Sequence, residues 1–175
     1  KDIAMANELT AERLREVLNY DPETGKFRWH VNRGGTAKVG DFAGCDNGEG
    51  YLRISVDGRR YKSHRLAWLY VHGEWPRDQI DHINGVRDDN RIANLREATN
   101  SENKQNLRRA RADNRSSGLL GVSWRKSAGR WGAEIMARGR KRALGLFATP
   151  EEAHAAYLKA KAELHPFSTI TEKTS

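Results

Sequence analysis

Apolar positions in the N-terminal half of the chain switch between helical and strand spacing. Residues 10–20 place their apolar side chains on one face, which predicts a helix. Residues 51–56 alternate apolar and polar side chains, which predicts a strand, and Asp57-Gly58 would turn that strand into a hairpin. Residues 64–72 form an apolar stretch of helical length. This half therefore mixes helices with short antiparallel strands.

A second group of elements follows between residues 79 and 111. The pattern predicts a strand over 79–83, a turn at Asn84-Gly85, a second strand over 92–98 and a helix over 100–111. Asparagine is a poor helix and strand former that favours turns and caps. This window holds more asparagines than its turns and caps require. A chemical role for some of them would explain this excess.

The C-terminal third has the pattern of a small α+β unit. Residues 113–117 are polar and predict a linker. Short strands are expected over 121–124, 131–138 and 143–147, and an amphipathic helix over 150–164. A three-stranded sheet with one helix across it is the simplest assembly of these elements.

The charge of the chain points to a polyanionic partner. The net charge is +8, and residues 104–142 hold twelve Lys or Arg against two acids. The single cysteine, Cys45, excludes a disulfide framework and a paired-cysteine zinc site. No apolar run approaches the ~18 residues of a membrane span, and no signal peptide pattern is present. We expect a cytoplasmic protein that binds no membrane.

Four polar residues between 81 and 103 form a candidate catalytic group. Asp81 and His82 are adjacent at the end of the first strand, so their side chains can approach one phosphate from two directions. The imidazole of His82 suits deprotonation of a water molecule at neutral pH. Asn103, early in the helix, can bring an amide oxygen beside Asp81, and two such oxygen donors suit magnesium. Asn94 is placed to hold the imidazole through its other ring nitrogen.

Each of these residues has a plainer explanation when it is taken alone. An Asp-His pair is most often a feature of a surface turn, and an asparagine is most often a cap. Their order on strand, loop, strand and helix favours a functional interpretation instead. A base, a metal site and an orienting group suffice to hydrolyse a phosphodiester bond.

The same segment resembles the HNH nucleases of the ββα-metal superfamily, in particular the phage and intron homing endonucleases. The resemblance covers roughly residues 64–106. It rests on HRLAW at 64–68, DHINGVRDDN at 81–90, ANLREAT at 93–99 and NSENKQN at 100–106.

The resemblance implies a role for each of these polar residues. Asp81 and Asn103 would bind one divalent ion, magnesium or alternatively manganese. His82 would be the general base and Asn94 the central asparagine of the catalytic group. Asn103 stands where other branches of the family hold histidine. His64 resembles the histidine that precedes the domain, with a structural or substrate-contacting role.

The C-terminal third is similar to the Apetala/ethylene-response-factor DNA-binding domain. The similarity rests on GVSWRKSAGRWGAEI at 121–135 and LGLFATPEEAHAAY at 144–157. It implies that the sheet enters the major groove of DNA. Ala128, Met136 and Ala143 depart from the plant pattern.

Two sets of residues are expected to contact DNA. Arginine can grip guanine edges or phosphates from a strand. In the C-terminal third the expected residues are Arg125, Arg130, Trp131, Glu134, Arg138, Arg140, Lys141 and Arg142. Before it, those expected to follow the DNA backbone are Arg108, Arg109, Arg111 and Arg115. For Trp124 and Trp131, packing of a small core is an equally good explanation.

Together these observations predict an α+β protein in which a ββα-metal HNH nuclease module precedes a three-stranded antiparallel sheet packed on one helix. We expect an N-terminal helix and irregular β segment over 5–50, the HNH module over 51–112, the linker over 113–117 and the Apetala/ERF-type domain over 118–168. The function would be that of a metal-dependent DNA endonuclease, site-specific as a homing or nicking enzyme, which leaves 5′-phosphate and 3′-hydroxyl ends. Its partner would be double-stranded DNA, with no small-molecule cofactor, and a monomer is favoured over a dimer.

Three alternatives stay open at this stage. The first is a DNA-binding regulator whose nuclease module is inactive, and the second is an RNA-binding structural protein. The third is a structural zinc site built from His64, His72 and His82, which lacks a recognised spacing.

Overall fold

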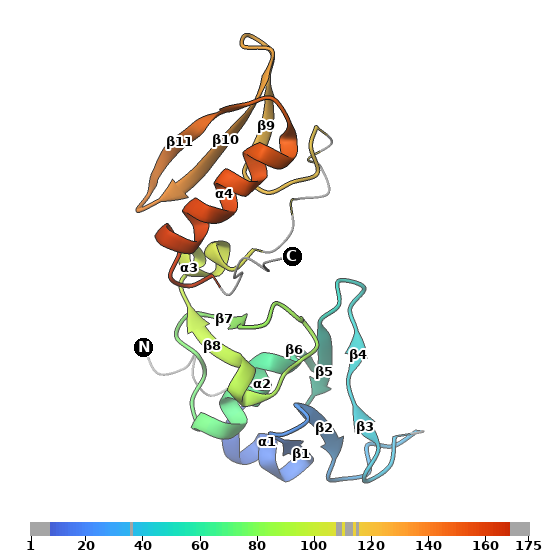
Figure 1. Ribbon diagram of the computed structural model, residues 1–175. Helices are drawn as coiled ribbons and strands as arrows, with labels where there is room; N and C mark the ends of the chain where they lie inside the picture. Colours follow the sequence, from blue (N-terminus) through green and yellow to red (C-terminus); the bar gives the residue numbers. More distant parts are fainter. Residues whose placement is uncertain (1–7, 36, 108–109, 111–113, 115, 169–175) are drawn as a thin grey trace. The chain divides into compact units, whose positions relative to one another are not determined.

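The computed structural model describes residues 8–35, 37–107, 110, 114 and 116–168, and the chain forms two compact units (Figure 1). The first unit is Lys1–Asn100 and the second is Ser101–Ser175. Both contain antiparallel sheets and helices, which confirms the predicted α+β class. Among the described residues, no helix has the length and apolar character needed to cross a membrane.

The first unit contains two α-helices, one 3₁₀ turn and eight strands among its described residues. In chain order they are α1 (Ala11–Val17), β1 (Leu18–Asp21), β2 (Lys26–Trp29), β3 (Phe42–Ala43), β4 (Cys45–Asp46), β5 (Leu52–Val56), β6 (Arg59–Lys62), α2 (Ser63–His72), β7 (Gln79–His82), η1 (Ile92–Asn94) and β8 (Leu95–Ala98). The strands form three antiparallel sheets with the orders β1-β2-β3, β4-β5-β6 and β7-β8.

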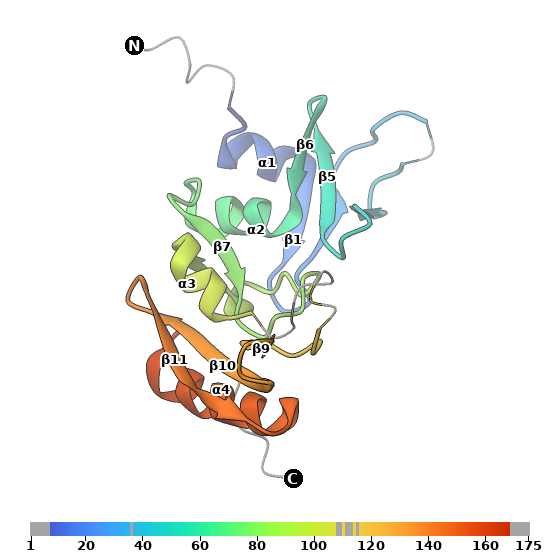
Figure 2. The same ribbon diagram turned by 90° about the horizontal axis from the view of Figure 1, so that it is seen from above.

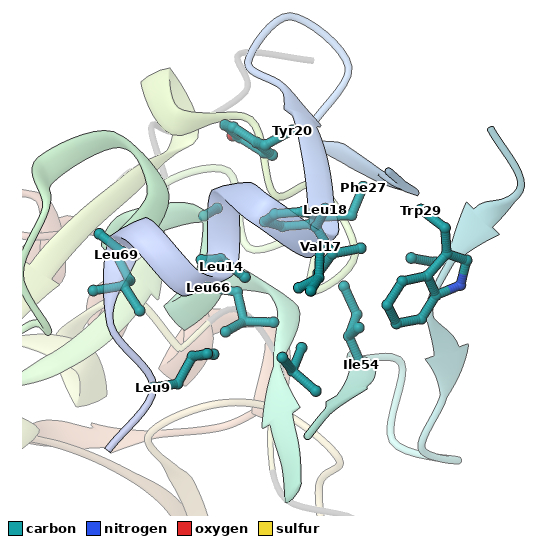
Figure 3. Packing of buried hydrophobic residues seen from close by; sticks show 14 of the residues in the cluster. Leu9, Leu14, Val17, Leu18, Tyr20, Phe27, Trp29, Ile54, Leu66 and Leu69 are labelled. Carbon is teal, nitrogen blue, oxygen red and sulfur yellow. The ribbon is translucent and has the colours of Figure 1, made fainter. Parts of the chain in front are cut away.

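One hydrophobic core joins α1, α2 and all three sheets of the first unit. Leu14, Leu18 and Leu66 are fully buried in it, and Figure 3 shows side chains from both helices and from the strands meeting there. Each such leucine stabilises the fold by about 2 kcal/mol relative to an exposed one. Ile80 and Leu95 extend the same core into the β7-β8 hairpin. The hairpin that carries the candidate catalytic residues is therefore anchored to the body of the unit.

Two predicted elements have different bounds in the structure. The helix expected over 10–20 stops at Val17, where the N–H of Leu18 bonds the Leu14 carbonyl. From Leu18 the side chains alternate between buried and exposed, because the chain continues directly as a strand paired with β2. The strand expected over 92–98 begins with the 3₁₀ turn η1, and only its second part pairs with β7.

Local signals account for a turn and two helix ends in the first unit. The hydroxyl of Thr10 accepts a hydrogen bond from the Arg13 N–H and caps α1. Asp57 and Gly58 both have positive φ in the two-residue turn between β5 and β6. Gly73 ends α2 in the left-handed conformation.

The second unit is a three-stranded antiparallel sheet with one long helix. Its elements are α3 (Asn100–Gln105, which begins at the last residue of the first unit), β9 (Val122–Arg125), β10 (Arg130–Ala137), β11 (Arg140–Phe147) and α4 (Pro150–Leu164). The strand order is β11-β10-β9, and both views show α4 along one face of the sheet (Figure 1; Figure 2). The predicted sheet and covering helix are therefore confirmed.

The core of this unit is small and lies between the sheet and α4. Its buried hydrophobic residues are Val122, Ala133, Ile135, Ala153, Tyr157 and Ala160. Thr149 and Glu152 form a capping box at the start of α4, next to the proline at its first position. The helix predicted over 100–111 ends at Gln105, and part of its predicted C-terminal portion, like part of the linker at 113–117, lies outside the described residues.

Gly121 is a point where this small core tolerates no side chain. It has a φ of +71°, and a Cβ there would lie 2.0 Å from a ring carbon of Tyr157. Gly129 has a φ of +58°, yet a Cβ there would meet nothing within 4 Å. The two glycines thus share a left-handed backbone, which would be strained in any residue with a Cβ, and they differ in packing.

We predict that Gly121→Ala destabilises the second unit far more than Gly129→Ala does. Backbone strain alone costs about 1–3 kcal/mol in either variant, and overpacking adds about another 1–3 kcal/mol at position 121 only. Native-state hydrogen exchange of the amides in β9, β10 and β11 would measure the difference. Equal protection in the two variants would contradict the packing shown here.

Candidate active site

The β7-β8 hairpin carries the two residues expected to act on a phosphate. Asp81 and His82 are both buried at the end of β7. In the hairpin register Asp81 lies opposite Arg96, whose Nε and Nη2 donate to one carboxylate oxygen at 3.0 and 2.8 Å. This ion pair offsets the cost of burying the carboxylate and fixes its orientation. Arg96 was not predicted from the sequence, because the two strands were predicted without the register that pairs it with Asp81.

The imidazole of His82 is held by Asn90. Its Nε2 lies 3.0 Å from Asn90 Oδ1, and both side chains are buried. Burial lowers the pKa of His82, while the hydrogen bond with Asn90 and the charge of Asp81 oppose that shift. A neutral imidazole at neutral pH is the form that a general base requires.

Asn94 has a different role from the one that sequence reasoning gave it. It was expected to hold the imidazole, but its side chain accepts from the Asn84 N–H at 2.9 Å and donates to the Asp89 carbonyl at 2.8 Å. These bonds fix both ends of the loop that leads away from His82. The contact seen at Nε2 of His82 comes from Asn90 instead. The two asparagines are four positions apart in the sequence, and their spacing from His82 does not show which of them contacts its ring.

Two aromatic residues enclose the imidazole further. The ring of His64 lies perpendicular to that of His82 with centroids 5.0 Å apart, and the ring of Tyr51 lies 5.9 Å from it. Burial and then the neighbouring His82 lower the pKa of His64 to about 3. His64 thus packs as a neutral ring, which fits the structural one of the two roles expected for it, and the substrate-contacting role stays a prediction.

The structure does not support the alternative of a zinc site. The ring of His72 packs against Trp68, with centroids 4.2 Å apart, while His64 and His82 pack against each other. Within the described part of the chain, no three residues of the types His, Cys, Asp and Glu are grouped so that they could hold a metal ion.

A group of cationic side chains surrounds Tyr51. Lys62 Nζ and Arg87 Cζ each lie 5.1 Å from the centroid of the Tyr51 ring. Arg87 is fixed further by a bond from Nη1 to the Glu49 carbonyl at 2.8 Å. Because Tyr51 also neighbours His82, these two cations belong to the surroundings of the catalytic candidate. We call Tyr51, Lys62 and Arg87 the Tyr51 cluster.

Asn103 lies in α3, which belongs almost entirely to the second unit. Its pairing with Asp81 around a metal ion stays a prediction from the sequence. The chemistry of the donors fits such an ion, since a carboxylate and an amide oxygen are the ligand types that magnesium takes alongside water and phosphate.

The second unit presents the other predicted contacts to DNA. Arg125 and Lys141 both form ion pairs with Glu134, the latter at 2.6 Å, and the pKa of Glu134 falls because of the hydrogen bond from Lys141 and the charge of Arg125. Trp131 packs against the small core and contacts Trp124 edge to face at 5.1 Å. Packing, one of the two explanations left open for Trp131, is therefore observed.

The remaining predicted contacts fall into two groups. Four arginines of the sheet are exposed and form no ion pair with any described residue: Arg130, Arg138, Arg140 and Arg142. Four others lie outside the described residues: Arg108, Arg109, Arg111 and Arg115.

Comparisons with known proteins agree with the chemistry of the hairpin. The chain is 32% identical over 81 residues to "Protein 3.8" of Escherichia phage T7, an alignment that covers 46% of this chain and 65% of that protein. The chain thus spans slightly less than two thirds of that relative. No solved structure gives a significant match. Residues 61–105, which hold Asp81, His82, Asn90 and Asn94, match the family model described as HNH endonuclease.

Proposed function

We propose that this protein is a metal-dependent endonuclease that hydrolyses phosphodiester bonds of double-stranded DNA. The observation that carries the proposal is the buried His82, hydrogen-bonded at Nε2 and adjacent to the buried carboxylate of Asp81, within the segment that matches HNH endonucleases. A neutral imidazole beside an anionic oxygen donor provides a base and a site for a cation in one place.

In the proposed reaction, His82 takes a proton from the water molecule that attacks phosphorus. A divalent ion, magnesium or alternatively manganese, would be held by Asp81 and, as the sequence pattern assigns, Asn103, and would stabilise the charge on the departing 3′ oxygen. Arg96 keeps the Asp81 carboxylate oriented. Asn94 keeps the loop after β7 closed, so that the base stays in place. The products would carry 5′-phosphate and 3′-hydroxyl ends.

We predict that the protein converts supercoiled plasmid to nicked or linear DNA with magnesium, and that EDTA or His82→Ala abolishes the conversion. Removal of a base that acts directly on water costs about 10²–10⁴-fold in rate. Gel electrophoresis of the plasmid forms over time measures it. His72→Ala serves as the matched control, since His72 packs against Trp68 and should retain full activity. Wild-type protein that binds plasmid but never cuts it would instead favour a DNA-binding regulator with an inactive nuclease module.

The Tyr51 cluster would bind the phosphates on either side of the bond that is cut. Lys62 and Arg87 are both exposed, and Arg87 is also held by its hydrogen bond to the Glu49 carbonyl. These two cations lie on one ring near the base and create a positive surface. Among the described residues, no carboxylate forms an ion pair with either of them. Phosphate oxygens are the natural ligands of such a surface.

We predict that the double variant Lys62→Gln/Arg87→Gln binds a short DNA duplex with a weaker dependence on salt. Each lost phosphate contact lowers the slope of log K against log [salt] by about 0.9, so the slope should fall by about 2. Fluorescence anisotropy over a range of salt concentrations measures this slope. Arg13→Gln is the control, because Arg13 is already paired with Asp57 and Glu16. A slope in the double variant equal to that of the control would contradict the assignment.

The second unit would supply further affinity for DNA through its sheet. Arg130, Arg138, Arg140 and Arg142, which form no ion pair with a described residue, would contact phosphates together with Arg108, Arg109, Arg111 and Arg115 before the sheet. Arg125, Trp131, Glu134 and Lys141 complete the set proposed from the sequence. The likeness to an Apetala/ERF-type domain and a homing or nicking specificity both belong to this proposal. The arrangement of three strands against one helix supports it, since sheets of this kind enter the major groove.

A further inference from the structure

A tyrosine from outside the HNH-matched segment contacts the asparagine that holds the catalytic histidine. Tyr20 lies in β1, far in sequence from residues 61–105. Its hydroxyl donates to the backbone carbonyl of Asn90 at 2.7 Å, and the bond is buried. The rings of Phe27 and Tyr70 pack against the Tyr20 ring at 4.8 and 5.6 Å. Burial raises the pKa of Tyr20 to about 12, so the phenol stays a hydrogen-bond donor.

The turn after β1 supports the same backbone. Gly25 has a φ of +70°. A Cβ there would lie 2.4 Å from the backbone nitrogen of Arg91 and 2.5 Å from the backbone carbonyl carbon of Asn90. The β1-β2 hairpin therefore packs backbone against backbone on residues 90–91. With the bond from Tyr20, it fixes the position of Asn90 from two directions.

The side chain of Asn90 in turn holds the ring of His82 through a hydrogen bond. Asn90 is fully buried, and its Oδ1 lies 3.0 Å from His82 Nε2. With Oδ1 of Asn90 facing the ring, Nε2 is the donor of this bond and carries the proton of the neutral ring, because a carbonyl oxygen accepts hydrogen bonds and cannot donate them. The lone pair that can accept a proton from water is then on Nδ1. The same hydrogen bond persists when Nδ1 becomes protonated.

We propose that Tyr20 is a positioning residue for catalysis: the β1-β2 hairpin, through Tyr20 and Asn90, holds His82 in the tautomer whose Nδ1 is the base. The catalytic part of this inference rests on the proposed nuclease function. The structural part concerns only the ring of His82 and can be measured in the absence of DNA and metal.

The first test compares Tyr20→Phe with Tyr70→Phe. Both variants remove one hydroxyl from the same aromatic group, but only the first removes the bond to Asn90. We expect Tyr20→Phe to lower kcat for plasmid nicking by about tenfold with KM unchanged, because small misplacements of a reacting group cost up to about 100-fold. Tyr70→Phe should match the wild-type kcat. Equal kcat values in the two variants would overturn the proposal.

The second test reads the tautomer directly by ¹⁵N NMR of the histidine rings. The His82 signals are assigned as those that His82→Ala lacks. The wild-type spectrum should show Nε2 protonated, and Tyr20→Phe should show a mixture of tautomers, whereas Tyr70→Phe should not. An Nδ1-protonated ring in the wild type would overturn the proposal. Absence of DNA cleavage together with the expected NMR pattern would refute the nuclease function while leaving the positioning of the ring established.

A pair of variants at position 90 decides the matter if Tyr20→Phe does not fold. Asn90→Asp retains an oxygen acceptor facing Nε2, and Asn90→Leu has none. We expect Asn90→Asp to retain the Nε2-protonated tautomer and Asn90→Leu to lose it. A purely structural role of Asn90 would give the same ring spectrum in both variants, and that result would overturn the proposal.

Discussion

The burial of polar side chains around the β7-β8 hairpin is the constraint on which the candidate active site depends. A buried polar group destabilises the fold unless it finds a hydrogen-bond partner. Here Asp81 is bonded by Arg96, His82 by Asn90, and Asn94 by the backbone at both ends of one loop. Arg96 lies in β8, whereas the partners of His82 and Asn94 lie in the loop between β7 and η1. The site therefore forms only when the hairpin, the loop and the strand opposite are all in place.

The same constraint explains why the small HNH-matched segment is embedded in a larger unit. Residues 61–105 contain α2 and the β7-β8 hairpin, and they supply fewer buried residues to the core of the first unit than the elements before them do. The helix α1 and the strands before β7 supply most of the hydrophobic core, and Ile80 and Leu95 join the hairpin to it. The hydroxyl of Tyr20 also holds the backbone of Asn90 through a hydrogen bond to its carbonyl. The N-terminal elements thus stabilise the hairpin and also restrict the geometry at its end.

The helices, the β5-β6 hairpin, the sheet of the second unit and the residues at the end of β7 were predictable from the sequence, because turns, caps and alternation are local signals. The strands β1, β3 and β4 were not predicted. The sequence did not predict that α1 would end at Val17, since Leu14, Val17 and Leu18 satisfy a helix and a helix followed by a strand equally well. It also missed Asn90 as the partner of His82. Which of several nearby asparagines reaches the ring depends on how the loop folds back, and that path is set by tertiary contacts such as the one from Tyr20.

Charge in the second unit shows a similar limit of sequence reasoning. Counting residues makes the sheet strongly basic, yet Glu134 lies between Arg125 and Lys141 and pairs with both. A cationic side chain that is already paired with a carboxylate loses that ion pair when it contacts a phosphate. The free energy of binding that it contributes is therefore smaller. The exposed arginines of β10, β11 and the turn between them have no such partner among the described residues. The attraction of this sheet for a polyanion is therefore concentrated at Arg130 and along the β10-β11 hairpin rather than spread over its open face.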